Sequence, residues 1–228
     1  YLCGCDGAHS SVRKGLELQF LGGKYDQSFF VADVDAKNES IPKNDISLFI
    51  NENGFCGIFP IRTSGMYRVI GIVPPTISEH TSISFEDIVP YLNEIVTLNV
   101  ERVNWFSTYQ SHHRVASEFR KGRVFILGDA AHIHSPAGGQ GMNTGIGDSM
   151  NLAWKLAGTL QDRIDPLVLD TYNLERLSFA KLLVSTTDTA FKNLIGENLA
   201  GRTFRNVIFP YVLPFLLKFP PVRRGMFN

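Results

Sequence analysis

Short runs of apolar and β-branched residues, each broken by polar positions, dominate the chain between about residues 28 and 73. Runs of this length and composition are typical of β-strands. The pair Asn53-Gly54 between two of the runs is a strong signal for a tight hairpin. The pattern predicts an antiparallel meander whose strands are Ser28–Val34, Ile46–Ile50, Phe55–Ile61 and Met66–Val73.

Pro74-Pro75 ends this pattern, and helical signals become frequent after it. Ser84 followed by Asp87 predicts a capped helix that runs to about Leu98, and a strand over Arg102–Tyr109 is expected next. Three more helical segments are expected: Met142–Leu160, Pro166 to about Phe191, and Leu199 to about Phe219, the last split by prolines. The first is amphipathic, and its apolar stripe comprises Ile146, Met150, Ala153, Ala157 and Leu160.

The segment Gly122–Lys155 contains most of the candidate chemistry. Its apolar run Val124–Leu127 predicts a buried strand, which stops at Gly128-Asp129. A glycine-rich loop with Pro136 then leads into the helix that begins near Met142. A strand, an acid at its carboxyl end and a helix N-terminus together predict a place for an anionic or polar cofactor.

A phosphate-binding nucleotide loop is a second interpretation of this segment. Gly145-x-Gly147 supplies two of the required glycines, but no direct strand-to-helix turn and no third glycine accompany them, and a Walker lysine pattern is missing. A flavin ring fits better, because donors from Gly141, Met142 and Asn143 would stabilise the negative charge of its reduced form. Asp129 is suited to accept a hydrogen bond from a sugar-like hydroxyl.

The N-terminal stretch Tyr1–Cys5 has the pattern of a strand, and Asp6-Gly7 after it is a turn pair. Ser10 or Ser11 could cap a short helix that follows. Taken alone, this stretch is more often an ordinary turn than a functional motif.

Composition excludes several functions. The 22 basic and 22 acidic side chains balance, which argues against nucleic acid or an anionic membrane as the main partner. Three cysteines do not make a disulfide framework, so we expect a reducing, cytoplasmic setting. Neither Cys3-Gly4-Cys5 nor His112-His113-Arg114 has further ligands at metal-site spacing, and Val207–Phe219 is too short and too interrupted to span a membrane.

Two motifs carry a resemblance to a known family. The first is Cys5–Arg13, CDGAHSSVR, and the second combines Gly122–His132, GRVFILGDAAH, with Pro136 and Gly139–Asn143, GQGMN. In both motifs the chain resembles the FAD-dependent aromatic-ring monooxygenases of the para-hydroxybenzoate hydroxylase fold, such as the single-component phenol, 3-hydroxyphenylpropionate and polyketide hydroxylases. The resemblance covers the whole chain.

The resemblance implies a role for each matched residue. Asp129 would bind the ribityl chain of FAD, and Pro136, the implied catalytic position, would lie beside the flavin ring where substrate and oxygen meet. The first motif would contribute to placing FAD and to the encounter with NADPH. The cofactor-binding residues that the resemblance implies are Asp6, Gly7, Arg13, Gly128, Asp129, Pro136, Gly139, Gly141, Met142 and Asn143, with no metal.

The resemblance also implies a reaction. NADPH or NADH would pass a hydride to FAD, O2 would add at flavin C4a, and the hydroperoxide would transfer one oxygen atom to a phenolic or other aromatic ring. We expect a small aromatic substrate and O2 as partners, no nucleic acid and no membrane span, and we keep a homodimer open.

The implied fold class is α/β, or mixed α+β: part of an FAD-binding domain, an antiparallel substrate-domain sheet and C-terminal helices. The expected segments are 1–15 with the Asp-Gly motif, 16–110 for the substrate domain, 111–165 with the Gly-Asp motif, and 166–228 for the C-terminal helices. The family begins with a strand–GxGxxG–helix unit that binds the ADP half of FAD, and the sequence lacks one. We therefore expect the middle and later part of a larger enzyme, inactive by itself.

Two other functions are kept as alternatives. The missing dinucleotide unit is consistent with a non-catalytic flavoprotein remnant or binding module. A flavin-dependent halogenase or related oxidoreductase would keep the cofactor and change the chemistry, although no extra lysine-bearing motif favours it.

Overall fold

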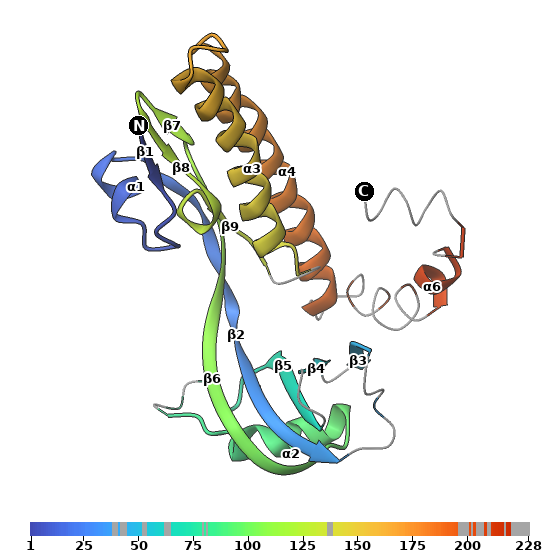
Figure 1. Cartoon of the computed structure of the whole chain (residues 1–228). Coiled ribbons are helices and arrows are strands. Elements are labelled where there is room, and N and C mark those ends of the chain that lie inside the picture. The colour runs from blue at the N-terminus through green and yellow to red at the C-terminus, as the bar shows by residue number, and fades with distance from the viewer. Residues whose placement is uncertain are drawn as a thin grey trace. The chain divides into compact units, whose positions relative to one another are not determined.

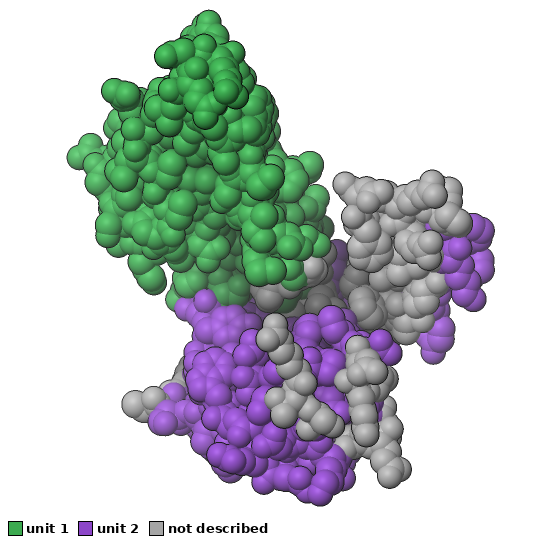
Figure 2. Space-filling view, in the orientation of Figure 1, with its two compact units in different colours: residues 1–25, 111–191 green, residues 26–110, 192–228 purple. Residues whose placement is uncertain are grey.

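A computed structural model of the chain divides into two compact units, coloured separately in Figure 2. Unit 1 comprises residues 1–25 and 111–191, and unit 2 comprises residues 26–110 and 192–228. Each unit has its own apolar core. The structure describes residues 1–37, 41, 45–51, 54–61, 65–78, 80, 82–135, 139–195, 201, 203, 208, 211–216 and 218–219.

A small sheet brings the two sequence motifs together in unit 1. Strand β1 (Leu2–Gly4) runs parallel to β8 (Val124–Ile126), and the two-residue strand β7 (Arg120–Lys121) pairs antiparallel with β8. The Asp-Gly turn and helix α1 (Ser11–Gly15) follow β1, while the short 3-10 helix η1 (Gly128–Ala130) follows β8. Since carboxyl ends of parallel strands meet at one edge, both motifs lie at the same edge of the sheet.

Two long helices complete unit 1, α3 (Gly141–Leu160) and α4 (Val168–Ile195), which Figure 1 shows side by side. The apolar stripe of an amphipathic helix usually marks its buried face. Instead Ile146, Met150 and Leu160 are more than half exposed. The buried face of α3 is mostly polar and comprises Thr144, Asp148, Leu152, Lys155, Gly158 and Thr159.

The unit boundaries differ from the expected segments in two places. Unit 1 continues through Tyr25 instead of ending near residue 15, and most of α4 belongs to it rather than to a separate C-terminal region. Side-chain contacts explain both differences. Tyr25 Oη donates to the Asp188 carboxylate on α4 at 2.9 Å, and the fully buried Tyr172 donates to the Ile126 carbonyl at 2.9 Å.

Unit 2 contains the expected antiparallel strands, but in a different order. They are β3 (Ser47–Asn51), β4 (Gly54–Pro60) and β5 (Met66–Ile72), and helix α2 (Phe85–Ile95) follows them. The full strand order is β3-β4-β5-β2-β6-β9, so β2 (Phe20–Lys37) pairs with β5 rather than with the next strand in sequence. Asp87 accepts hydrogen bonds from the backbone N–H and the hydroxyl of Ser84, as the capping pattern predicted.

Strands β2 and β6 (Asn99–Ala116) are each 18 residues long, far longer than predicted. Charged and polar residues interrupt the apolar alternation of both strands. The sequence pattern therefore did not show where the two strands begin and end. His112-His113-Arg114 lies within β6, near its carboxyl end. The two-residue strand β9 (His132–Ile133) pairs with β6 at Arg114 and Val115.

The described residues near the C-terminus include the short helix α6 (Leu213–Leu216). Much of the helical region expected from Leu199 to Phe219 lies outside the described residues, as do Asn53 and Pro136. None of the helices described is long and apolar enough to cross a membrane.

Gly22 on β2 provides a test of the pairing between β2 and β6. Its φ is +135°, and an added Cβ would stand 2.0 Å from the His113 carbonyl oxygen on β6. We expect Gly22→Ala to lower the free energy of unfolding by about 2 kcal/mol, through backbone strain and the clash. Thermal unfolding measures this change. Gly15→Ala is the control, because no atom lies within 4 Å of its Cβ position; equal melting temperatures for the two variants would contradict this close approach.

Candidate functional site

The two sequence motifs line one cavity of unit 1. The Leu127 N–H donates to the Gly4 carbonyl at 3.0 Å and aligns the ends of β8 and β1. Beyond this bond a cavity of about 490 Å³ opens between the motifs and one face of α3. Its lining comprises Cys5, Gly7, Leu127, Gly128, Asp129, Met142, Gly145, Ile146, Ser149 and Met150.

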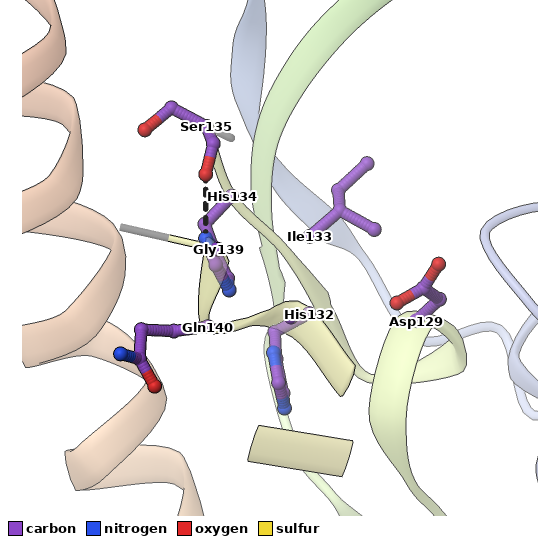
Figure 3. Close-up of a pocket in the computed structure, with 8 residues that line it drawn as sticks. Asp129, His132, Ile133, His134, Ser135, Gly139 and Gln140 are labelled. Carbon is purple, nitrogen blue, oxygen red and sulfur yellow. Dashed lines mark hydrogen bonds between the residues drawn. The ribbon is translucent and has the colours of Figure 1, made fainter. Parts of the chain in front are cut away.

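A second cavity, of about 200 Å³, adjoins Asp129 on another side. In the view of Figure 3 the rings of His132 and His134 lie between Asp129 and Gln140. Asp129 borders both cavities, so a ligand spanning them would pass its carboxylate. The second cavity is lined by Asp129, His132, Ile133, His134, Ser135, Gly139, Gln140 and Gly141.

The Asp129 carboxylate is available to a ligand. Asp129 is exposed on η1, and its side chain has no hydrogen-bond partner among the residues that the structure describes. A carboxylate only accepts hydrogen bonds, so its natural ligand partners are hydroxyl and N–H groups. This geometry fits the hydroxyl-rich ribityl chain of FAD.

The N-terminus of α3 supplies donors beside the same cavities. The helix begins at Gly141, and no side chain caps it. The N–H groups of Gly141, Met142 and Asn143 therefore have no partner within the helix, and Met142 and Asn143 are exposed. Together with the helix dipole, these donors suit a ligand edge that carries negative charge.

Asp6, by contrast, is engaged within its own turn. Its carboxylate accepts the Ser10 hydroxyl at 2.5 Å and the backbone N–H groups of Ser11 and Val12 at 2.7 and 3.1 Å. The hydrogen bond from Ser10 is the largest cause that lowers the pKa of Asp6 below its ordinary value, and the backbone hydrogen bonds lower it further. Asp6 thus shapes the first turn of α1, while neighbouring Gly7 lines the larger cavity.

Arg13 is only 5% exposed and joins the two motifs from below the surface. One terminal nitrogen donates to the Ala130 carbonyl at the end of η1, and the other donates to the Ala8 carbonyl, both at 2.8 Å. Its guanidinium carbon also lies 3.8 Å from the centroid of the Phe20 ring. These contacts give Arg13 a structural role, and its part in an NADPH encounter stays a prediction.

A buried polar network supports η1, and the sequence did not reveal it. The fully buried Asp148 on α3 accepts the Gly128 N–H at 3.0 Å and faces His132 Nε2 at 2.8 Å. Arg176 Nε on α4 donates to its other oxygen at 2.6 Å. Burial by itself raises the pKa of Asp148, but the His132, Arg176 and Gly128 contacts outweigh burial and lower it below its ordinary value.

His134 and Ser135 are two further residues that the sequence did not single out. His134 Nδ1 lies 2.8 Å from the Ser135 carbonyl, while Nε2 is buried without a partner among the described residues. Burial lowers the pKa of His134, so we expect a neutral ring whose Nε2 can accept a hydrogen bond at the smaller cavity. The buried Ser135 hydroxyl donates to the Thr187 carbonyl and fastens the loop to α4.

The structure thus brings together most of the expected site residues. Asp129, Gly139 and Gly141 line the smaller cavity, and Gly7, Gly128, Asp129 and Met142 line the larger one. Asn143 lies in the first turn of α3. Asp6 and Arg13 belong to the first motif but line neither cavity. Pro136, the implied catalytic position, lies outside the described residues.

Comparisons with known proteins identify relatives of this chain. Residues 1–187 match the FAD binding domain family. The chain is 34% identical over 234 residues to an uncharacterized aromatic compound monooxygenase of Bacillus subtilis (strain 168), with 98% of this chain and 44% of the relative covered. It is 33% identical over 202 residues to pentachlorophenol 4-monooxygenase of Sphingobium chlorophenolicum, with 86% and 37% covered.

Solved structures also resemble the chain. The Diels-Alderase PyrE3 of pyrroindomycin biosynthesis gives a TM-score of 0.80 at 28% identity, over 99% of this chain and 48% of that one. Aklavinone-11 hydroxylase, in a ternary complex with FAD and aklavinone, gives a TM-score of 0.73 at 25% identity, over 88% and 38%. The chain spans less than half the length of these relatives.

The family match covers both sequence motifs and all of α3. The two relatives named as monooxygenases cover 98% and 86% of this chain. The chain belongs to the FAD binding domain family, within the group of FAD-dependent aromatic-ring monooxygenases.

Proposed function

We propose that this chain is the flavin-binding and substrate-facing part of an FAD-dependent monooxygenase that hydroxylates a phenolic or other aromatic ring with NADPH or NADH and O2. The observation that carries the proposal is the Asp129 carboxylate, which borders two cavities and has no hydrogen-bond partner among the described residues. The uncapped N-terminus of α3 beside it supplies the N–H donors that a flavin needs.

Each part of the site would have a distinct task. Asp129 would accept hydrogen bonds from ribityl hydroxyls, and the N–H groups of Gly141, Met142 and Asn143 would bind the pyrimidine edge of the flavin. The neutral Nε2 of His134 would accept a hydrogen bond at the smaller cavity. Gly128 and Gly139 would let the backbone approach the cofactor, and Pro136 would border the place where substrate and oxygen meet.

Bound FAD would supply the redox chemistry, taking a hydride from NAD(P)H and passing one oxygen atom of O2 to the ring. The overall reaction balances as aromatic substrate, NAD(P)H, a proton and O2 giving hydroxylated product, NAD(P)⁺ and water. Names of relatives support this assignment, since two of them are monooxygenases of aromatic compounds or of pentachlorophenol. The fold alone does not settle the reaction, because the similar PyrE3 structure is a Diels-Alderase.

The test uses the protein as its gene encodes it, loaded with FAD. A panel of phenols is added with NADPH or NADH under ¹⁸O2, and products are read by mass spectrometry. We expect substrate-stimulated NAD(P)H oxidation and one ¹⁸O atom in the product. A flavin-loaded protein that neither consumes NAD(P)H nor incorporates ¹⁸O with any phenol would contradict the proposal.

The same assay separates the alternatives. With chloride and bromide salts added to the mixture, a halogen atom in the product and no added oxygen would identify a halogenase. A non-catalytic remnant would be expected to bind no flavin. A ring-closed isomer formed without NAD(P)H would indicate chemistry of the Diels-Alderase kind.

A further inference from the structure

Asp148 occupies an unusual place for an acidic residue. It lies in the second turn of α3 and its side chain is fully buried, although α3 exposes an apolar stripe to the other side. Burying a carboxylate is costly unless hydrogen bonds and an opposite charge compensate it. Here three groups from three other elements do so: the Gly128 N–H, the His132 ring and the Arg176 guanidinium.

The first contact holds the turn that carries Asp129. The backbone N–H of Gly128 donates to Asp148 Oδ2 at 3.0 Å. Gly128 adopts a φ of +54°, a left-handed conformation that glycine takes up without strain. Gly145, three residues before Asp148, packs on the same turn, since its Cβ position lies 3.4 Å from the Gly128 Cα. Asp148 thus fixes η1 against α3, and Asp129 is the next residue in η1.

The second contact orients His132. A carboxylate can only accept, so the 2.8 Å contact places a proton on His132 Nε2 and leaves Nδ1 on the other side of the ring. The ring also stacks on Phe119, with centroids 5.8 Å apart and planes 23° apart. His132 lines the smaller cavity, so Asp148 determines which face of this ring the cavity receives.

The third contact joins Asp148 to α4. Arg176 Nε donates to Asp148 Oδ1 at 2.6 Å, and the guanidinium lies 4.4 Å from the centroid of the Phe179 ring. Gly147 leaves room for it, because a Cβ there would stand 3.3 Å from an Arg176 terminal nitrogen. The pair Gly145-x-Gly147, which resembled part of a phosphate loop, therefore serves helix packing around Asp148.

We propose that Asp148 is a positioning residue for cofactor binding: it acts through Gly128 and His132 to hold Asp129 and the smaller cavity in their binding geometry. This inference rests on the proposed function, because the ligand whose binding Asp148 would support is FAD. Asp148 itself is buried behind η1 and lines neither cavity.

The test compares Asp148→Asn with Glu175→Gln in the full gene product. Glu175 is a matched control, because it also joins α4 to α3, through Lys155 at 2.8 Å and Asn151 at 2.7 Å, but touches neither Gly128 nor His132. Three quantities are measured: the melting temperature, the Kd for FAD, and hydrogen exchange at Gly128–Ala130 in the flavin-free protein. Nitrogen-15 spectra of the histidine rings add a direct signature of the His132 tautomer.

We expect Asp148→Asn to raise the Kd for FAD roughly tenfold and to speed exchange at Gly128 by a similar factor, since a charge-assisted bond is lost. The His132 signal should shift toward the other tautomer, because the new amide group can donate to Nε2. Glu175→Gln should stay within about twofold of the parent in both Kd and exchange. If Asp148→Asn lowers only the melting temperature and otherwise matches Glu175→Gln, the proposal is wrong.

A milder variant covers the case in which Asp148→Asn does not fold. Arg176→Lys keeps a cation beside Asp148 but loses the Nε donor, so faster exchange at Gly128 and weaker FAD binding are still expected. Parental values in both readouts would overturn the proposal. Exchange is measured without flavin, so it judges Asp148 even if the protein proves not to bind FAD, an outcome that would instead refute the proposed function.

Discussion

Asp129→Ala is expected to weaken FAD binding by about 10- to 100-fold, the range set by losing hydrogen bonds to a charged acceptor. Asp129 is exposed and its carboxylate has no hydrogen-bond partner among the described residues, so its removal takes no internal bond from the fold. The melting temperature should therefore change little. Fluorescence titration with FAD and a thermal melt measure the two quantities on the same preparation.

Asp170→Ala is the matched control for this change. Asp170 is an acid of the same unit, near the start of α4, and it pairs with Arg120 on β7 away from both cavities. We expect its FAD affinity to equal that of the parent. Full flavin affinity in Asp129→Ala would show that the ribityl role is wrong, whereas equal weakening in both variants would point to a general charge effect.

Arg13→Ala is expected to lower the free energy of unfolding by about 3 to 5 kcal/mol, because it leaves the buried Ala130 carbonyl and the half-buried Ala8 carbonyl without a donor. The contact with the Phe20 ring is lost as well. For a chain of this size such a change corresponds to a drop in melting temperature of about 10 °C. Thermal unfolding followed by circular dichroism measures it.

Arg123→Ala provides the comparison for Arg13. Arg123 is an exposed arginine of unit 1 that also lies over an aromatic ring, that of Tyr1. Its replacement should shift the melting temperature by no more than about 2 °C. If Arg13→Ala keeps parental stability and raises only the KM for NADPH, the encounter role implied by the resemblance is right and the structural role is wrong.

Much of the fold was predictable because local patterns agree with the final structure. The run Val124–Leu127, the capped helix after Ser84 and the helix near Met142 each begin or end within a residue or two of the expected place. The parallel pairing of β1 with β8 was not visible, since three-residue strands carry no register information. The order of β2 and β5 also depends on distant pairing, which local sequence does not encode.

The residues of the site also divide into those that local sequence signals indicate and those that depend on distant partners. Asp129, Gly139 and Gly141 could be singled out from the sequence because a strand end, glycines and a helix start are local signals, and their roles stay predictions. Asp148 and Arg176 were missed because their partners lie 20 and 28 residues away in sequence. The polar positions Thr144, Asp148 and Lys155 do recur with helical spacing, and that recurrence was the available signal for a buried polar face.

The direct test of the central claim is the absorption spectrum and flavin content of the protein as its gene encodes it. The account predicts a yellow protein, or one that becomes yellow on titration with FAD, with about one flavin released per chain on denaturation. It also predicts that Asp129→Ala, prepared in parallel, retains much less flavin under dialysis. A folded, colourless protein that leaves the fluorescence of added FAD unchanged would contradict the account.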